Sequence, residues 1–192
     1  MDNSQRFYDA LAMQGSWVRV LVTQRHRPHT SRVRKQAMLF AFMHLCFLLV
    51  FAMHFFHTIV AWVLAFLLQT AAVFVSVLHL VFVLEYEDRT NNAMELEQQL
   101  NPLIIAELSI RLFSLVHLFM LRWWISLVFS LAEPLYDYWI FRRGAFLVDA
   151  TSAWKQLRLL RLDARLRIVY HAILLVFSSI ALVFSIVEER ES

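Results

Sequence analysis

Residues that interrupt helices are scarce in this chain. Only two glycines and three prolines occur among its 192 residues. Because glycine and proline form tight turns and break helices, their scarcity favours long helices over a turn-rich β-structure. The single cysteine, Cys46, also excludes a disulfide framework within the chain.

Charged residues are few as well, at 17% of the chain, whereas hydrophobic residues make up 60%. The mean hydropathy is +0.57. An ordinary soluble domain is only about half apolar. We therefore predict one small all-α polytopic membrane protein. Its net charge of +3 is gathered in a few basic clusters, which suits the inner leaflet of a membrane better than nucleic acid.

Motifs for catalysis or metal binding do not occur in the sequence. The first long apolar stretch contains four histidines: His44, His54, His57 and His79. His54 and His57 would share a helix face, but no third ligand or carboxylate lies at metal-ligand spacing, so histidines at helix contacts or at the membrane interface are favoured. Glu133 and Asp137 lie four residues apart near an apolar end, which favours a partly solvated helix end over acid–base chemistry. The sequence thus predicts no enzyme, no cofactor and no metal site.

The first 36 residues form a polar and basic extension. Apolar residues at roughly helical spacing predict a short amphipathic helix at the membrane interface before Pro28. A basic cluster follows directly before the first apolar stretch and consists of Arg25, Arg27, Arg32, Arg34 and Lys35. The positive-inside rule places this cluster in the cytosol. A mitochondrial transit peptide is the alternative, and Asp2 and Asp9 count against it.

Two apolar stretches after residue 36 predict three membrane spans. Ala37–Leu84 predicts two of them, and the C-terminal stretch predicts the third. As one helix, Ala37–Leu84 would be about 70 Å long, more than twice the thickness of the hydrocarbon core. We therefore divide it into spans at 37–57 and 60–84, with a turn near His57-Thr58. The last span covers 168–187.

The region Leu108–Phe141 can form one span or two. Two short spans, 103–121 and 123–141, would meet near Arg122 and return the basic segment Arg142–Arg167 to the cytosol, as the positive-inside rule requires. A turn near the membrane surface also suits Arg122, because a charge is costly at the bilayer centre. We therefore predict about five membrane helices, with a kink or a helix end at Pro134.

Four segments follow one another in an order that is typical of one membrane protein family. They are Glu85–Asn92 with Leu100-Asn101-Pro102-Leu103 and Glu107; Trp124; Leu131-Ala132-Glu133-Pro134-Leu135 with Tyr138; and Val148-Asp149-Ala150-Thr151 with Leu157 and Tyr170-His171. From about Trp62 onward the chain resembles the cornichon family, and it looks closest to the fungal type. The resemblance implies a four-helix bundle, here with an extra N-terminal span. It divides the chain into a basic cytosolic extension (1–36), the extra span (37–59) and a cornichon-like membrane domain (60–192).

The resemblance implies a receptor that selects transmembrane proteins for COPII vesicles, which carry them from the endoplasmic reticulum to the Golgi. The expected location is the endoplasmic reticulum membrane, with cycling to the Golgi. The expected partners are the cargo-adaptor subunit of the COPII coat, transmembrane cargo proteins and the lipid bilayer, but no nucleic acid. An auxiliary subunit of an ion channel or transporter is the alternative function. A membrane enzyme or carrier would need polar residues that converge inside the membrane, and we expect too few of them.

The resemblance also suggests a coat-binding segment. A coat-contact motif of the fungal type, Ile-Phe-Arg-Thr-Leu, corresponds to Ala153, Trp154, Lys155, Gln156 and Leu157. At the aromatic, basic and leucine positions of the motif this chain has residues of the same type, whereas alanine and glutamine replace isoleucine and threonine. In a helix, Ala153 and Leu157 would share one face beside Trp154 and form a small apolar anchor. The alternative is that Trp154 and Leu157 rest in the lipid headgroup layer.

A cargo-binding segment is implied in the same way. The family's cargo-contact stretch corresponds to Leu118, Phe119, Met120, Leu121 and Arg122. Arg122 stands where the family has a small residue, which changes how closely another helix can approach.

Overall fold

The computed structural model describes residues 3–23 and 31–191, and these ranges contain helices and turns but no strand. Arg25, Arg27 and Pro28 lie outside the described residues. The helices are α1 (Asn3–Gly15), a short π-helix (Arg19–Thr23), α2 (Ser31–Met53), α3 (Thr58–Glu87), α4 (Ala93–Met120), α5 (Trp124–Ser130), α6 (Ala132–Arg142) and α7 (Ala153–Glu191). The helix α1 agrees with the short helix that we predicted before Pro28.

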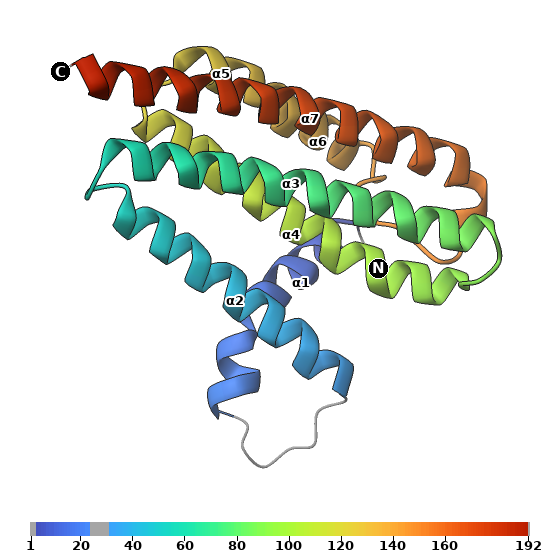
Figure 1. Ribbon diagram of the computed structural model, residues 1–192. Helices are drawn as coiled ribbons and strands as arrows, with labels where there is room; N and C mark the ends of the chain where they lie inside the picture. Colours follow the sequence, from blue (N-terminus) through green and yellow to red (C-terminus); the bar gives the residue numbers. More distant parts are fainter. Residues whose placement is uncertain (1–2, 24–30, 192) are drawn as a thin grey trace.

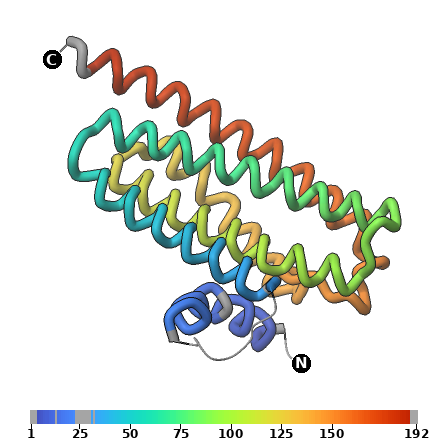
Figure 2. Tube along the Cα trace, turned by 60° about the horizontal axis from the view of Figure 1, so that its bottom comes forward, coloured from blue at the N-terminus to red at the C-terminus, as the bar shows by residue number. Residues whose placement is uncertain are grey.

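The long helices form an elongated bundle (Figure 1). Helix α3 packs along both α4 and α7, while α2 lies on the outside against α3 and α4. Helix α1 lies against the side of the bundle, where it contacts α4 and α2 (Figure 2).

Four of the described helices are long and apolar enough to cross a membrane: Val33–Met53, Thr58–Glu87, Ala93–Met120 and Ala153–Glu188. They confirm the predicted all-α polytopic membrane protein. The long apolar stretch is divided as predicted, because α2 ends at Met53 and α3 begins at Thr58. The side chain of His57 caps α3 by accepting a hydrogen bond of 3.3 Å from the backbone N–H of Ile59.

The predicted span at 123–141 is not one continuous helix. It is divided at Leu131 into α5 and α6, each too short to cross a bilayer alone. The break has a local cause in Pro134, which has no N–H to donate to the carbonyl of Ser130 and whose ring crowds that carbonyl. The two short helices nevertheless follow one another along the bundle, so together they take the place of the predicted span (Figure 1).

The connections are sorted between the two ends of the bundle (Figures 1 and 2). The turns 54–57 and 121–123 lie at one end with the C-terminus of α7. The turn 88–92 and the α6–α7 loop (143–152) lie at the other end, which we call the loop end. Arg122 lies in a turn, as predicted, with a φ of 57°.

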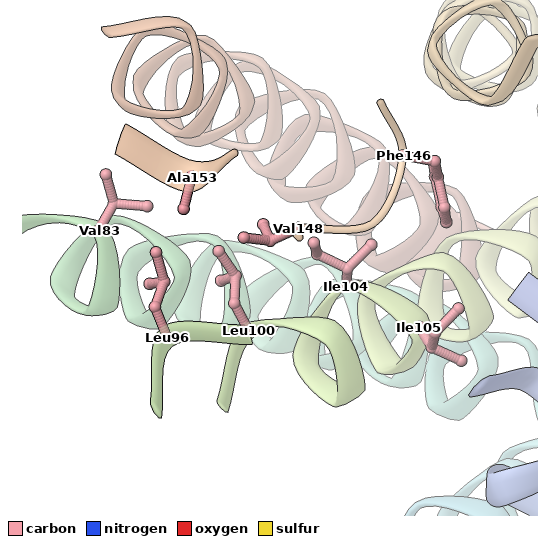
Figure 3. Packing of buried hydrophobic residues seen from close by; sticks show 8 residues of the cluster. All are labelled: Val83, Leu96, Leu100, Ile104, Ile105, Phe146, Val148 and Ala153. Carbon is pink, nitrogen blue, oxygen red and sulfur yellow. The ribbon is translucent and has the colours of Figure 1, made fainter. Parts of the chain in front are cut away.

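A buried hydrophobic core occupies the loop end (Figure 3). It consists of Val83, Leu96, Leu100, Ile104, Ile105, Phe146, Val148 and Ala153. Phe146 and Val148 come from the α6–α7 loop, so this loop is folded into the core. The segment Arg142–Arg167, which we predicted as a polar segment between spans, therefore consists of a packed loop followed by the first turns of α7. With 39 residues, α7 is about 58 Å long and exceeds the hydrocarbon core of about 30 Å.

Candidate functional site

The α6–α7 loop is held by the first turns of α4. The side-chain amide of Asn101 donates to the carbonyl of Val148 at 3.0 Å, and the N–H of Val148 donates to the Oδ1 atom of Asn101 at 2.8 Å. One turn earlier, Glu97 accepts a hydrogen bond of 3.0 Å from the N–H of Ala150. Two of the segments that carry the family resemblance thus contact each other directly.

The N-terminal helix binds the same loop. Arg6 of α1 donates to Glu97 at 2.7 Å, to Asp149 at 2.9 Å and to the carbonyl of Val148 at 3.2 Å. The hydroxyl and the N–H of Thr151 donate to Asp149 at 2.7 and 2.9 Å, and they hold the pKa of Asp149 below its ordinary value, with a smaller contribution from Arg6. The sequence indicated the helix but not this contact, because an isolated arginine carries no signal of its partner.

The predicted coat-binding segment forms the first turns of α7. Ala153 and Leu157 share one face, as predicted, but this face points inward: Ala153 is 1% exposed and Leu157 packs against the core. Trp154 is 65% exposed, and the ammonium group of Lys155 lies 5.1 Å from its ring centre. Gln156 is half-buried. An exposed anchor made of all three apolar residues is therefore not formed, because two of them complete the core, and Trp154 is the apolar side chain that remains on the surface.

The predicted cargo-binding segment lies at the opposite end of the bundle, where α4 ends. Leu118 is buried, Met120 and Leu121 are half-buried, and Phe119 is 59% exposed. Arg122 is exposed in the following turn. Of the apolar residues in this segment, Phe119 therefore offers the largest free surface to another helix.

A cluster of charged and polar side chains lies inside the middle part of the bundle. Its buried members are Ser76 and His79 from α3, Glu107 and Arg111 from α4, Glu133 and Asp137 from α6, and Arg167 and His171 from α7. None of these eight residues is more than 7% exposed. We call them, together with the half-buried Asp163 of α7, the ionic cluster.

Two arginines organise the ionic cluster. Arg111 contacts Glu107 at 2.9 Å and Glu133 at 3.0 Å, and it forms a further ion pair with Asp137. Arg167 contacts Asp137 and Asp163, both at 2.8 Å. The carboxylates of α4 and α6 are thus tied to guanidinium groups of α4 and α7.

These contacts change part of the sequence interpretation. Glu133 and Asp137 are not a partly solvated helix end, because both are buried and paired with arginine. Polar residues do converge inside the bundle, contrary to our expectation. The sequence contains one indication of this convergence. Glu107 and Arg111 lie four residues apart, as do Arg167 and His171, so the two members of each pair share a helix face. The spacing does not show which helix faces contact one another, because that depends on how the helices pack.

Comparison with known proteins gives one match. A family model described as Cornichon protein matches residues 58–180. No curated protein and no solved structure matches the chain. The matched region begins at α3 and reaches into the last turns of α7, so it includes the α6–α7 loop, both predicted binding segments and the ionic cluster.

Proposed function

This chain belongs to the cornichon family, and from that membership we propose that it is a non-enzymatic receptor which selects transmembrane proteins for export from the endoplasmic reticulum in COPII vesicles. The observation that carries this proposal is the family match over α3 to α7. A general role in cargo export rests on the family alone. The coat contact, the cargo contact and the location are parts of the proposal.

The loop end is the proposed cytosolic side. Arg142 and Arg143 lie where α6 passes into the α6–α7 loop, and Lys155 and Arg158 follow the loop, so the positive-inside rule supports this orientation. In this orientation the first turns of α7 extend from the membrane toward the coat, and Trp154 is accessible to it. An exposed tryptophan next to basic residues suits an anchor for a protein partner, because tryptophan is enriched among the residues that dominate binding energy.

The cargo contact is proposed at the other end of the bundle. Phe119 is exposed at the end of α4, and Trp124 lies next to it with the two ring centres 5.8 Å apart. Within a membrane, close van der Waals packing drives helix association, so this aromatic pair offers a surface to a transmembrane helix of the cargo. The two proposed contacts would then lie on opposite sides of the membrane, and coat and cargo would not compete for one surface.

A vesicle-budding assay tests the coat contact. We expect Trp154→Ala to reduce packaging of the protein into COPII vesicles without changing its thermal unfolding, because the side chain is largely exposed. The matched control is Leu159→Ala, which removes an apolar side chain that is 69% exposed on the same helix. Packaging of Trp154→Ala at the level of the unchanged protein would remove Trp154 from the coat contact. A protein that remains with a channel or transporter and never enters vesicles would instead be an auxiliary subunit.

Accessibility of single cysteines tests the orientation. With Cys46 replaced by serine, a cysteine at Ser4 and one at Gly144 should both react with an impermeant thiol reagent from the cytosolic side. A cysteine at Ser192 should react only from the lumenal side, because the predicted topology has five crossings. A protected Gly144 position would place the α6–α7 loop in the lumen and overturn the COPII mechanism.

A further inference from the structure

The ionic cluster does not balance its own charge. It contains four carboxylates, from Glu107, Glu133, Asp137 and Asp163, but only two guanidinium groups, from Arg111 and Arg167. The carboxylates thus outnumber the guanidinium groups by two, and the other basic side chains of the cluster are the imidazoles of His79 and His171, which lie 3.3–3.6 Å from Glu107 and Glu133. Burying an uncompensated charge is costly, so buried charges in proteins are paired or coordinate metal ions. A single divalent cation would supply the missing charge.

Three side chains from three helices converge with the ligand atoms that such a cation requires. Carboxylate oxygens of Glu107 and Glu133 and a ring nitrogen of His171 all lie within 4.8 Å of one another. The Nε2 atom of His171 is 3.3 Å from Glu133 Oε1 and 3.6 Å from Glu107 Oε1. Ligand bonds of about 2.0–2.1 Å in a tetrahedral zinc site place neighbouring ligand atoms about 3.3 Å apart. The observed separations therefore leave room for a metal ion between these atoms.

Unsatisfied hydrogen-bonding groups point to the same place. Both ring nitrogens of His171 and the Oε2 atom of Glu107 have no hydrogen-bond partner, although these two side chains are at most 1% exposed. The ring nitrogens of His79 are also without such a partner, and its Nδ1 atom lies 3.6 Å from Glu107 Oε2. Buried polar groups in proteins are nearly always satisfied. Of these atoms, His171 Nε2 lies beside both Glu107 and Glu133, where a bound ion would satisfy it.

We propose that Glu107, Glu133 and His171 bind a divalent transition-metal ion of the zinc class. The ion joins α4, α6 and α7 and neutralises the ionic cluster. One imidazole and two carboxylates match the nitrogen and oxygen ligands that zinc accepts, and three protein ligands leave a fourth position for water. A cavity of about 10 Å³ beside Glu133 and His171 has roughly the volume that one water molecule needs.

The surroundings of the proposed site support its ligands. Ser76 donates to Glu107 Oε1 at 2.8 Å, and Arg111 contacts both carboxylates, so each carboxylate is oriented by an outer donor, as is usual around protein metal sites. A cavity of about 300 Å³ between α6 and α7 extends from Ala145 and Phe146 of the loop to His79 and Arg167 of the ionic cluster. The cavity thus connects the loop end with part of the ionic cluster. The site is independent of the proposed export function.

Zinc titration of the full chain in detergent tests the proposal. After removal of metal with a chelator, we expect the protein to bind about one zinc ion per chain, the number that one three-ligand site holds. Glu107→Gln and His171→Asn should each weaken zinc binding by at least about tenfold, since even outer-shell changes cost that much. The controls Glu97→Gln and His57→Asn make the same chemical changes outside the cluster and should bind zinc like the unchanged protein. Circular dichroism of each variant shows whether it is folded.

X-ray absorption of the zinc-loaded, unchanged protein gives a test that needs no variant. We expect a shell of nitrogen and oxygen at about 2.0–2.1 Å with imidazole scattering and no sulfur. A shell without imidazole, or equal zinc binding by Glu107→Gln, overturns the proposal. So does the absence of stoichiometric zinc binding, which would mean that protons on His79 and His171 neutralise the cluster instead.

Discussion

Asn101 and Val148 are 47 residues apart in the chain and hold each other through two hydrogen bonds. The side chain of Asn101 acts as donor and acceptor toward the backbone of Val148, as a neighbouring strand would. Val148 then enters the core at the loop end, where it is 3% exposed. Asn101, together with Glu97 of α4 and Arg6 of α1, thus holds the loop that leads into the predicted coat-binding segment.

Asn101→Ala should loosen this loop. The substitution leaves the N–H of Val148 without a partner and its carbonyl with Arg6 alone, and an unsatisfied buried group costs about 1–3 kcal/mol. We expect faster hydrogen exchange at Phe146–Ser152 and a lower unfolding temperature in detergent. Asn91→Ala is the control, because Asn91 bonds to Gln99 and not to the loop. If the loop amides exchange hydrogen at the same rate in both variants, Asn101 does not hold the loop.

Arg167 and Arg161 allow a matched comparison of a buried and a half-exposed ion pair on one helix. The side chain of Arg167 is 7% exposed and lies among three carboxylates, whereas that of Arg161 is 34% exposed and pairs with Glu87. Arg167→Met should lower the free energy of unfolding by about 3–5 kcal/mol, because it leaves buried charges without a partner. Arg161→Met should change it by no more than about 1 kcal/mol. Denaturant unfolding in detergent measures both, and equal losses would contradict the burial of the ionic cluster.

Asp149 should make the loop sensitive to acid. Its pKa is held below the ordinary value of 3.8, first by the hydroxyl and N–H of Thr151 and then by Arg6. Because the pKa is lower in the folded than in the unfolded chain, the stabilisation is complete above the ordinary pKa and is lost as the pH falls through the folded pKa. Thr151→Val should move this loss to higher pH, and Arg6→Met should do so to a smaller extent.

Carboxyl ¹³C NMR measures the pKa of Asp149 in these variants directly. Thr90→Val is the control, because the Thr90 hydroxyl bonds to the carbonyl of Glu85 in another turn. An unchanged pKa in Thr151→Val would show that the hydroxyl contributes nothing to it.

Arg122 should tolerate glycine well. Its φ of 57° lies in the left-handed region, which costs an L-residue about 1–2 kcal/mol and which glycine adopts freely. We expect Arg122→Gly to raise the unfolding temperature and Arg122→Val to lower it, because a β-branched residue fits this region worst. Met120→Gly is the control, since glycine within α4 should destabilise by about 1 kcal/mol. A lower unfolding temperature for Arg122→Gly would mean that the Arg122 side chain makes a contact worth more than the strain.

Much of the fold could be predicted from local properties of the sequence. Helical class, membrane spans and the turns near His57 and Arg122 follow from hydropathy over short windows and from the cost of a charge inside a bilayer. The break before Pro134 follows from one missing N–H. The family resemblance also rested on short segments, and the family match confirms it.

The tertiary structure alone decided which helix faces meet. The inward orientation of Ala153 and Leu157, the binding of Arg6 to the loop, and the convergence of Glu107, Glu133 and His171 each depend on how α1, α4, α6 and α7 are rotated and shifted relative to one another. Periodicity assigns a residue to a face of its own helix, but it does not state which neighbour that face contacts. Side-chain packing over the whole bundle sets that relationship, and so the sequence by itself determined the helices while the packing decided the site.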